Sequence, residues 1–166
     1  MTCYLIFITP LGHMAVIYRA MPFAVIKILL PSQEKEDLVK AVEIFGRQPA
    51  GFHDNAFNIK ESIIDYFKGK PISFPWGWLE TDGLTKLQKS VLECTADIPY
   101  GELRSYQDIA VAIGRARAYR FVGTTLANNP FPILIPCHRV IRSDGSLGRF
   151  GGGSDMKRKL IELEAS

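Results

Sequence analysis

A cysteine and a histidine stand side by side in the second half of the chain, at Cys137 and His138. They follow the apolar segment 131–135 and Pro136, so the thiol is expected on a rigid, buried ledge. A thiolate is a strong nucleophile and an imidazole can take the thiol proton, so the pair could carry nucleophilic chemistry. Arg139 adds positive charge, which favours the thiolate.

The imidazole of such a pair needs a third group to orient it. Glu162 and Glu164, near the end of the chain, are the acidic candidates. Two other interpretations stay open at this point. Most cysteines in apolar segments are structural and inert. A cysteine hydrolase would need an oxyanion hole, and its nucleophile and base usually lie far apart in sequence.

Helices are expected around this pair. The spacing of apolar residues predicts four of them, over about 85–96, from 105 to before 114, over about 117–128 and over about 155–163. The second begins at Ser105, which together with Asp108 fits a capping box, and Gly114 ends it. The sequence therefore predicts a mainly helical second half.

The two middle helices, joined by a glycine turn, match the pattern of a helix-turn-helix. Any two adjacent amphipathic helices would give a similar pattern, so the motif is weak by itself. The basic residues between positions 99 and 153 are all arginines, and Arg115, Arg117 and Arg120 are expected on the second helix. Arginine suits bidentate phosphate contact. Nucleic acid is therefore one interpretation, and an ordinary basic surface is the other.

The first half reads as strands followed by helices. Apolar and β-branched runs predict strands over 4–9, 14–19 and 23–30, and helical spacing predicts helices over 34–45 and 54–67. Residues 70–83 are rich in proline and glycine and form the expected linker, pinned by Trp76 and Trp78. We expect two domains, 1–78 and 79–166. His13 and His53 are expected as surface or turn residues and not as metal ligands.

Bulk composition agrees with a folded intracellular protein. The chain has 166 residues, a net charge of +3 and three cysteines without metal-type spacing, which favours reduced thiols in the cytoplasm. No apolar run approaches the roughly 20 residues of a membrane span. The first ten residues lack a basic start and a clear cleavage site, so a secretory signal is not expected.

The sequence resembles the O6-alkylguanine-DNA alkyltransferase family, the methylated-DNA–protein-cysteine methyltransferases. The resemblance runs from about Thr85 to Glu164, and the proline-flanked cysteine segment is its most specific part. The matching segments are 98–102 (IPYGE), 105–110 (SYQDIA), 120–123 (RFVG), 129–141 (NPFPILIPCHRVI) and 145–153 (GSLGRFGGG).

The resemblance implies an α+β protein with a small N-terminal α/β domain, ribonuclease H-like, and a mainly helical, winged-helix-like C-terminal domain. It implies that double-stranded DNA is bound, that an O6-alkylated guanine is flipped out of the stack, and that its alkyl group moves irreversibly to Cys137 in a single turnover. It also implies a monomer that uses no cofactor and no metal and has no membrane partner. Whether O4-alkylthymine is accepted is left open.

Individual roles follow from the same resemblance. Cys137 would accept the alkyl group, His138 would take its proton through a water, and Glu164, preferred over Glu162, would fix the imidazole. Asn129 would brace the turn that holds the cysteine, and Tyr106 would donate to the flipped guanine. The residues expected to contact DNA are Arg120, which enters the stack, Tyr106, Arg117, Gly123 and Thr124. The residues expected around the base are Pro132, Val140, Phe150 and Gly151, with the carbonyls of Cys137 and Val140 reading the guanine amino group.

Some positions depart from the family pattern. Phe121 stands where alanine is frequent, Phe150 where tyrosine is common, and Ala116 where proline is frequent. A related alternative is an alkyltransferase-like protein that binds damaged DNA without repairing it. Members of that branch lack the acceptor cysteine, so Cys137 argues against it.

Overall fold

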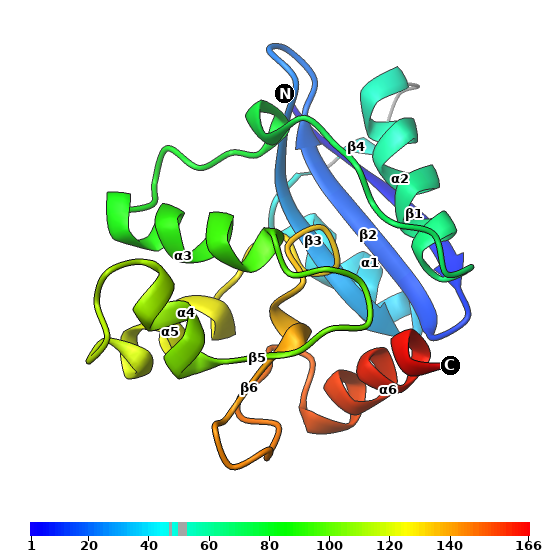
Figure 1. Ribbon diagram of the computed structural model, residues 1–166. Coiled ribbons are helices and arrows are strands. Elements are labelled where there is room, and N and C mark those ends of the chain that lie inside the picture. The colour runs from blue at the N-terminus through cyan, green and yellow to red at the C-terminus, as the bar shows by residue number, and fades with distance from the viewer. Residues whose placement is uncertain (47, 50–52) are drawn as a thin grey trace. The chain divides into compact units, whose positions relative to one another are not determined.

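The computed structural model describes residues 1–46, 48–49 and 53–166, and it forms two compact units, Met1–Glu80 and Thr81–Ser166. The architecture is mixed α/β, with strands in the first unit and mostly helices in the second (Figure 1). The division between the units falls after Glu80, two residues beyond the boundary that we expected after Trp78. Each unit is described by itself below.

The first unit is built on a sheet with the strand order β3-β2-β1-β4. Its strands are β1 (Thr2–Thr9), β2 (Gly12–Arg19), β3 (Ala24–Ser32) and the two-residue β4 (Gln48–Pro49). The first three pair antiparallel, whereas β4 runs parallel to β1. The expected strands are confirmed, and β4 is too short to give a period-two signal in the sequence. His13 lies within β2, not in the turn before it, and is half-buried.

Helices α1 (Lys35–Glu43) and α2 (Asp54–Tyr66) also match the helices expected in this half. Leu38 and Val42 of α1 pack with Ala15 and Ile17 of β2 in one buried cluster. His53 immediately precedes α2, and its ring stacks on Phe23 at a centroid distance of 4.7 Å. It is therefore half-buried in the segment before α2, with its ring packed on an aromatic side chain.

The expected linker is partly fastened to the first unit. The short 3₁₀ helix η1 (Trp76–Trp78) places the Trp78 ring edge-on to Phe23 at 5.3 Å. The next residues join the edge of the sheet, where Leu79 bridges Val25 and the Glu80 amide donates to the Val25 carbonyl at 2.8 Å. The prediction that tryptophan pins this segment is confirmed for Trp78.

The second unit carries the helices expected from the spacing of apolar residues. In chain order it contains α3 (Lys86–Ala96), β5 (Arg104–Ser105), α4 (Tyr106–Ala112), α5 (Tyr119–Ala127), the 3₁₀ helix η2 (Cys137–Arg139), β6 (Val140–Ile141) and α6 (Ser154–Ala165). Thr85 and Ser105 cap α3 and α4, each with a complete capping box. Strands β5 and β6 pair parallel over two residues.

Helices α4 and α5 form the expected helix-turn-helix pair, with one correction. Gly114 adopts a φ of +73° and ends α4, and the Gln107 side chain closes the turn by donating to the Ala116 carbonyl at 2.7 Å. Helix α5 begins only at Tyr119. Arg115 and Arg117 therefore lie in the turn and not on the second helix, because the chain needs those residues to reverse direction.

A buried loop leads from α5 to η2. All ten residues from Phe131 to Val140 are buried, as expected for the ledge before the cysteine. Within it Ile133 has a φ of +74°, a conformation that is strained for a β-branched residue. The Ile135 amide donates to the Phe131 carbonyl at 2.8 Å and closes this turn. Among the residues described, none of the helices is long and apolar enough to cross a membrane.

Candidate active site

Cys137 opens η2 and is 5% exposed. Its position is set by Asn129, which follows α5. The Asn129 side chain donates to the Ile135 carbonyl at 2.9 Å and accepts from the Phe131 amide at 2.9 Å, so one side chain closes the whole strained turn. The same side chain hydrogen-bonds with the thiol and lowers its pKa, against the effect of burial. Asn129 therefore links the end of α5 to the cysteine.

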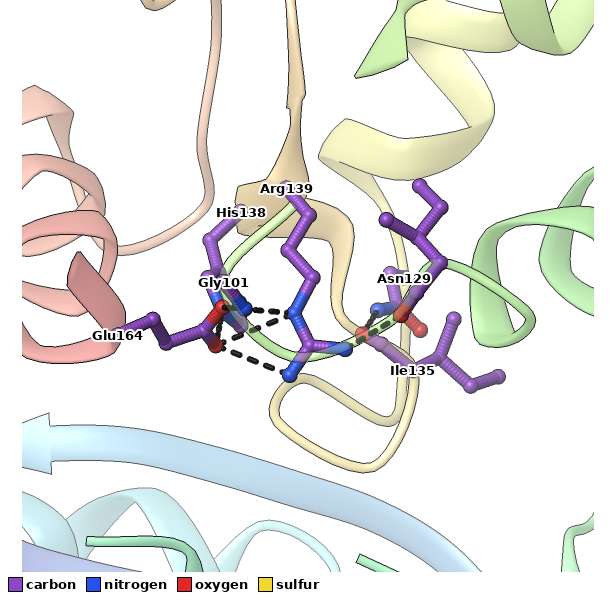
Figure 2. A network of polar contacts seen from close by, with 7 residues as sticks. Gly101, Asn129, Ile135, His138, Arg139 and Glu164 are labelled. Atoms are coloured by element: carbon purple, nitrogen blue, oxygen red, sulfur yellow. Dashed lines mark hydrogen bonds and ion pairs between the residues drawn. The ribbon is translucent and has the colours of Figure 1, made fainter. Parts of the chain in front are cut away.

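His138 is fully buried and faces α6. Its Nε2 lies 2.5 Å from Oε1 of Glu164, and both side chains are almost inaccessible. Figure 2 shows Glu164 reaching from α6 towards the side chains of His138 and Arg139. Of the two acidic candidates, only Glu164 is buried, whereas Glu162 is exposed on the same helix. The structure therefore brings Glu164 to the histidine.

Arg139 does not act as the sequence suggested. Its guanidinium binds the Glu164 carboxylate through Nε at 2.8 Å and a terminal nitrogen at 3.0 Å, and donates to the Ile98 carbonyl at 2.6 Å. The guanidinium charge is thus paired with the Glu164 carboxylate, and the charged side chain that lowers the pKa of Cys137 is a different one, that of Lys157.

The cation whose charge lowers the pKa of the Cys137 thiol is Lys157, which no sequence pattern had indicated. It is fully buried on α6. Its ammonium donates to the Val140 carbonyl at 2.6 Å and to the Tyr106 hydroxyl at 3.2 Å. Lys157, Leu160 and Glu164 are all buried and lie three and four residues apart. That spacing is a helical face, and it was the signal that could have identified Lys157.

The ionisable groups of the site are shifted mainly by burial. Burial raises the pKa of the Cys137 thiol, and Asn129 and the Lys157 charge oppose this only in part. Burial lowers the pKa of His138, and Glu164 raises it while Arg139 and Lys157 lower it. Burial also lowers the pKa of Lys157 to about 8. The resting site thus holds a neutral thiol beside a neutral imidazole.

An arginine-lined hollow of about 730 Å³ lies within the second unit, lined by residues of α4, of α5 and of the segment 142–149. It includes Tyr106, Arg120, Gly123 and Thr124, four of the residues expected to contact DNA. It also contains Arg142 and Arg149, which the sequence analysis did not single out. The fifth expected residue, Arg117, lines a separate shallow hollow with its neighbours in the 115–118 turn.

The residues expected around the base differ in their exposure. Pro132 and Val140 are buried, Phe150 is half-buried and Gly151 is exposed. The carbonyls of Cys137 and Val140 are already used, by the Val140 amide and by Lys157 respectively. Each carbonyl oxygen has a second lone pair, so neither is excluded from accepting another hydrogen bond.

No group of three or more metal-binding side chains occurs within residues 1–46, 48–49 and 53–166. The Glu164 carboxylate faces His138 and is bound by Arg139. A thiol beside an imidazole that a carboxylate contacts is an arrangement that suits proton transfer and nucleophilic attack by sulfur.

Comparison with known proteins places these features in a family. Residues 86–166 match the family model described as 6-O-methylguanine DNA methyltransferase, DNA binding domain. A methylated-DNA–protein-cysteine methyltransferase of Methanosarcina barkeri is 45% identical over 128 residues, covering 75% of this chain and 77% of the relative. A protein of the same name from Mycobacterium bovis is 49% identical over 106 residues, 64% of this chain and 63% of the relative.

Solved structures of relatives resemble this chain over nearly its whole length. The structure of Mycobacterium tuberculosis O6-methylguanine methyltransferase is 31% identical, has a TM-score of 0.78 and covers 99% of this chain and 93% of its own. A structure of M. tuberculosis OGT in complex with DNA is 30% identical, with a TM-score of 0.77 and coverage of 98% and 92%. The chain therefore belongs to the methylated-DNA–protein-cysteine methyltransferase family.

Proposed function

We propose that this protein repairs DNA by moving an alkyl group from O6 of guanine to the sulfur of Cys137, in one step and once per molecule. The observation that carries the proposal is the buried series Cys137, His138 and Glu164 in the same unit as an arginine-lined helix-turn-helix. The relative solved in complex with DNA supports the substrate class.

The site explains why a base is needed. Because burial raises the pKa of Cys137, little thiolate exists at neutral pH in the resting protein. Burial lowers the pKa of His138, so the neutral ring can accept the thiol proton, in our proposal through one water. The anionic Glu164 stabilises the imidazolium that results. Lys157 then lies close enough to stabilise the sulfur anion.

The transfer step forms one bond and breaks one bond. The sulfur attacks the saturated alkyl carbon, the carbon–O6 bond breaks, and its electron pair goes to the purine. The guanine anion needs a hydrogen-bond donor. Burial raises the pKa of Tyr106, so its phenol stays protonated and can donate. That hydroxyl donates to the Arg149 carbonyl at 3.4 Å.

The base must leave the duplex to reach Cys137, at a cost of a few kcal/mol. Arg120 is exposed on α5 and is our candidate for the side chain that fills the vacated place in the stack. Gly123 and Thr124 let α5 approach the DNA, and Arg117 contacts a phosphate from the turn. Pro132, Val140, Phe150 and Gly151 form the walls of the base pocket.

The finer fold assignment belongs to this proposal. The sheet order β3-β2-β1-β4, with one parallel strand after three antiparallel ones, supports a ribonuclease H-like first domain. The pair α4–α5 with the small β5–β6 ladder supports a winged-helix-like second domain. We propose that the protein acts as a monomer.

Incubation with duplex DNA that carries labelled O6-methylguanine tests the function. We expect at most one label per protein molecule, a mass gain of one methyl group on Cys137, and restored guanine in the DNA. Cys137→Ala should abolish transfer and keep affinity for the duplex. Multiple turnovers would indicate a hydrolase, and tight binding without transfer would indicate a recognition protein. Either result would overturn the proposal.

A further inference from the structure

Both oxygens of the Glu164 carboxylate are contacted by nitrogen atoms of neighbouring residues. Oε2 accepts from the Gly101 amide at 3.0 Å and from Arg139 Nε at 2.8 Å. Oε1 accepts from the terminal nitrogen of Arg139 at 3.0 Å and lies 2.5 Å from Nε2 of His138. Several donors to one carboxylate favour its ionised form. Glu164 is therefore an anion whose orientation is fixed from two sides (Figure 2).

Arg139 is itself fixed by the turn that follows α3. It donates to the Ile98 carbonyl at 2.6 Å, and its guanidinium lies 5.6 Å from the centre of the Tyr100 ring. Gly101 has a φ of +81°, and a Cβ there would lie 3.3 Å from the Glu164 carbonyl. The 98–101 turn is thus shaped to hold Arg139 and Glu164 together.

The fixed Glu164 carboxylate determines which ring nitrogen of His138 carries the proton. An ionised carboxylate only accepts hydrogen bonds, so the Nε2 that faces it must carry the proton. The Nδ1 lone pair is then the basic one. The charged groups that face the ring are Glu164 and Lys157 from α6 and Arg139 beside it on η2, with the Cys137 thiol adjacent. Of these, only Glu164 favours a charged imidazole, while burial, Arg139 and Lys157 oppose it.

We propose that Arg139 is a positioning residue for alkyl transfer: with the 98–101 turn it fixes Glu164 as an anion against Nε2 of His138 and keeps the imidazole neutral until the thiol proton arrives. This inference rests on the proposed function. It assigns to Arg139 a role exerted through Glu164 and His138, without contact to the alkyl group. Without Arg139, Glu164 would attract a proton onto the histidine–glutamate pair at neutral pH.

The test compares Arg139→Gln, Arg139→Lys and the wild-type protein in single-turnover transfer from a duplex that carries O6-methylguanine. The rates are measured from about pH 5.5 to about pH 9, the range in which an imidazole and a thiol titrate. We expect Arg139→Gln to shift the acidic limb of the pH–rate profile to higher pH by about one unit. At pH values below that limb, the transfer rate should then be about tenfold lower than in the wild-type protein. Arg139→Lys keeps the charge and loses the bidentate geometry. It should keep the limb near its wild-type position and lose rate.

Arg158→Gln is the matched control, because Arg158 is exposed on α6 and pairs with Asp155 of the same helix. Its profile should equal that of the wild type. A uniform loss of rate at every pH in Arg139→Gln, with the limb unmoved, would mean that Arg139 only supports the fold and would overturn the proposal.

A second measurement is independent of activity and of variant folding. Nitrogen NMR of the full-length wild-type protein should show His138 protonated on Nε2 and neutral at pH 7. An Nδ1-protonated ring, or an imidazolium at pH 7, would overturn the proposal. Failure of the wild-type protein to transfer methyl to Cys137 would instead overturn the proposed function, so the two failures are distinguishable.

Discussion

Lys157 is the residue whose chemistry departs most from its sequence context. A lysine on a polar-looking helix reads as solvent-exposed, yet this one is fully buried with three oxygen neighbours. Burial lowers its pKa to about 8 from a usual 10.5. The folded state therefore releases this proton at lower pH than the unfolded chain does. The lysine's contribution to stability is unfavourable at pH 7 and improves as the pH rises from about 8 towards 10.5.

Lys157→Met removes this titration. Relative to the variant, the wild-type protein should gain roughly 2 to 3 kcal/mol of unfolding free energy between pH 7 and pH 10. Urea denaturation of both proteins at the two pH values measures the difference. Titrating groups that do not sense the Lys157 charge cancel in it, whereas Cys137, whose pKa that charge lowers, does not. Equal pH dependence in the two proteins would show that Lys157 is not perturbed.

Gly148 tests the position of Tyr106. A Cβ on Gly148 would lie 2.6 Å from the Tyr106 hydroxyl oxygen and 2.8 Å from a ring carbon, so Gly148→Ala must push the phenol away. We expect slower methyl transfer, because Tyr106 would lose its alignment with Lys157 and the Arg149 carbonyl. Single-turnover kinetics measure this loss.

Gly145→Ala is the control for backbone strain. Gly145 also has a positive φ, of +87°, and nothing lies within 4 Å of the place where its Cβ would stand. Both alanines strain the backbone, at about 1 kcal/mol or more each. Only Gly148→Ala should slow transfer, and an equal effect of both would assign the loss to strain alone.

At the scale of elements, the capping boxes of α3 and α4 offer a matched pair. Ser105→Ala and Thr85→Ala each remove one box and should each cost about 1 kcal/mol of stability. Helix α4 has only seven residues and packs with α5 in the helix-turn-helix. Ser105→Ala should therefore also weaken binding to duplex DNA, whereas Thr85→Ala should not. Calorimetry and fluorescence anisotropy separate the two effects.

The elements were largely predictable because their signals are local. Caps at Thr85 and Ser105, a stop at Gly114 and helical periodicity are read within a few residues. The start of α5 was placed two residues too early, since the turn before it has no distinct sequence signature. The positive φ of Ile133 could not be predicted at all, because it is imposed by Asn129 and the buried loop and not by isoleucine.

The site was predictable in part for the same reason. Cys137 and His138 are adjacent in sequence, and the spacing of Glu164 came from the family resemblance. The partners of Arg139 could not be read from the chain, because Ile98 and Glu164 lie 41 and 25 residues away. Long-range polar contacts of this kind carry no periodic signal.

At the scale of the whole molecule, charge distribution should govern DNA affinity. Arg120, Arg142 and Arg149 line one hollow, and Asp144, the acidic residue among its lining side chains, is engaged by Ser146. The logarithm of the binding constant should fall linearly with the logarithm of salt concentration. Arg142→Gln should make that slope shallower by about one phosphate contact, or roughly 0.9.

Lys40→Gln is the comparison for this prediction. Lys40 is exposed on α1 in the first unit, away from the helix-turn-helix in sequence. The variant loses the same charge from the molecule, and we expect its salt slope to equal that of the wild type. If both substitutions lower the slope equally, net charge governs DNA binding, and the arginine-lined hollow does not.

The burial of Cys137 has a consequence for the lifetime of the protein. Under the proposed function the sulfur of Cys137 is used only once, so any stray oxidant or alkylating metabolite that reaches it first would waste it. With 5% of the residue accessible and its pKa raised, the resting thiol is a poor target for such reagents. The burial that makes the proposed transfer depend on His138 should therefore also protect the thiol from side reactions before the substrate base arrives.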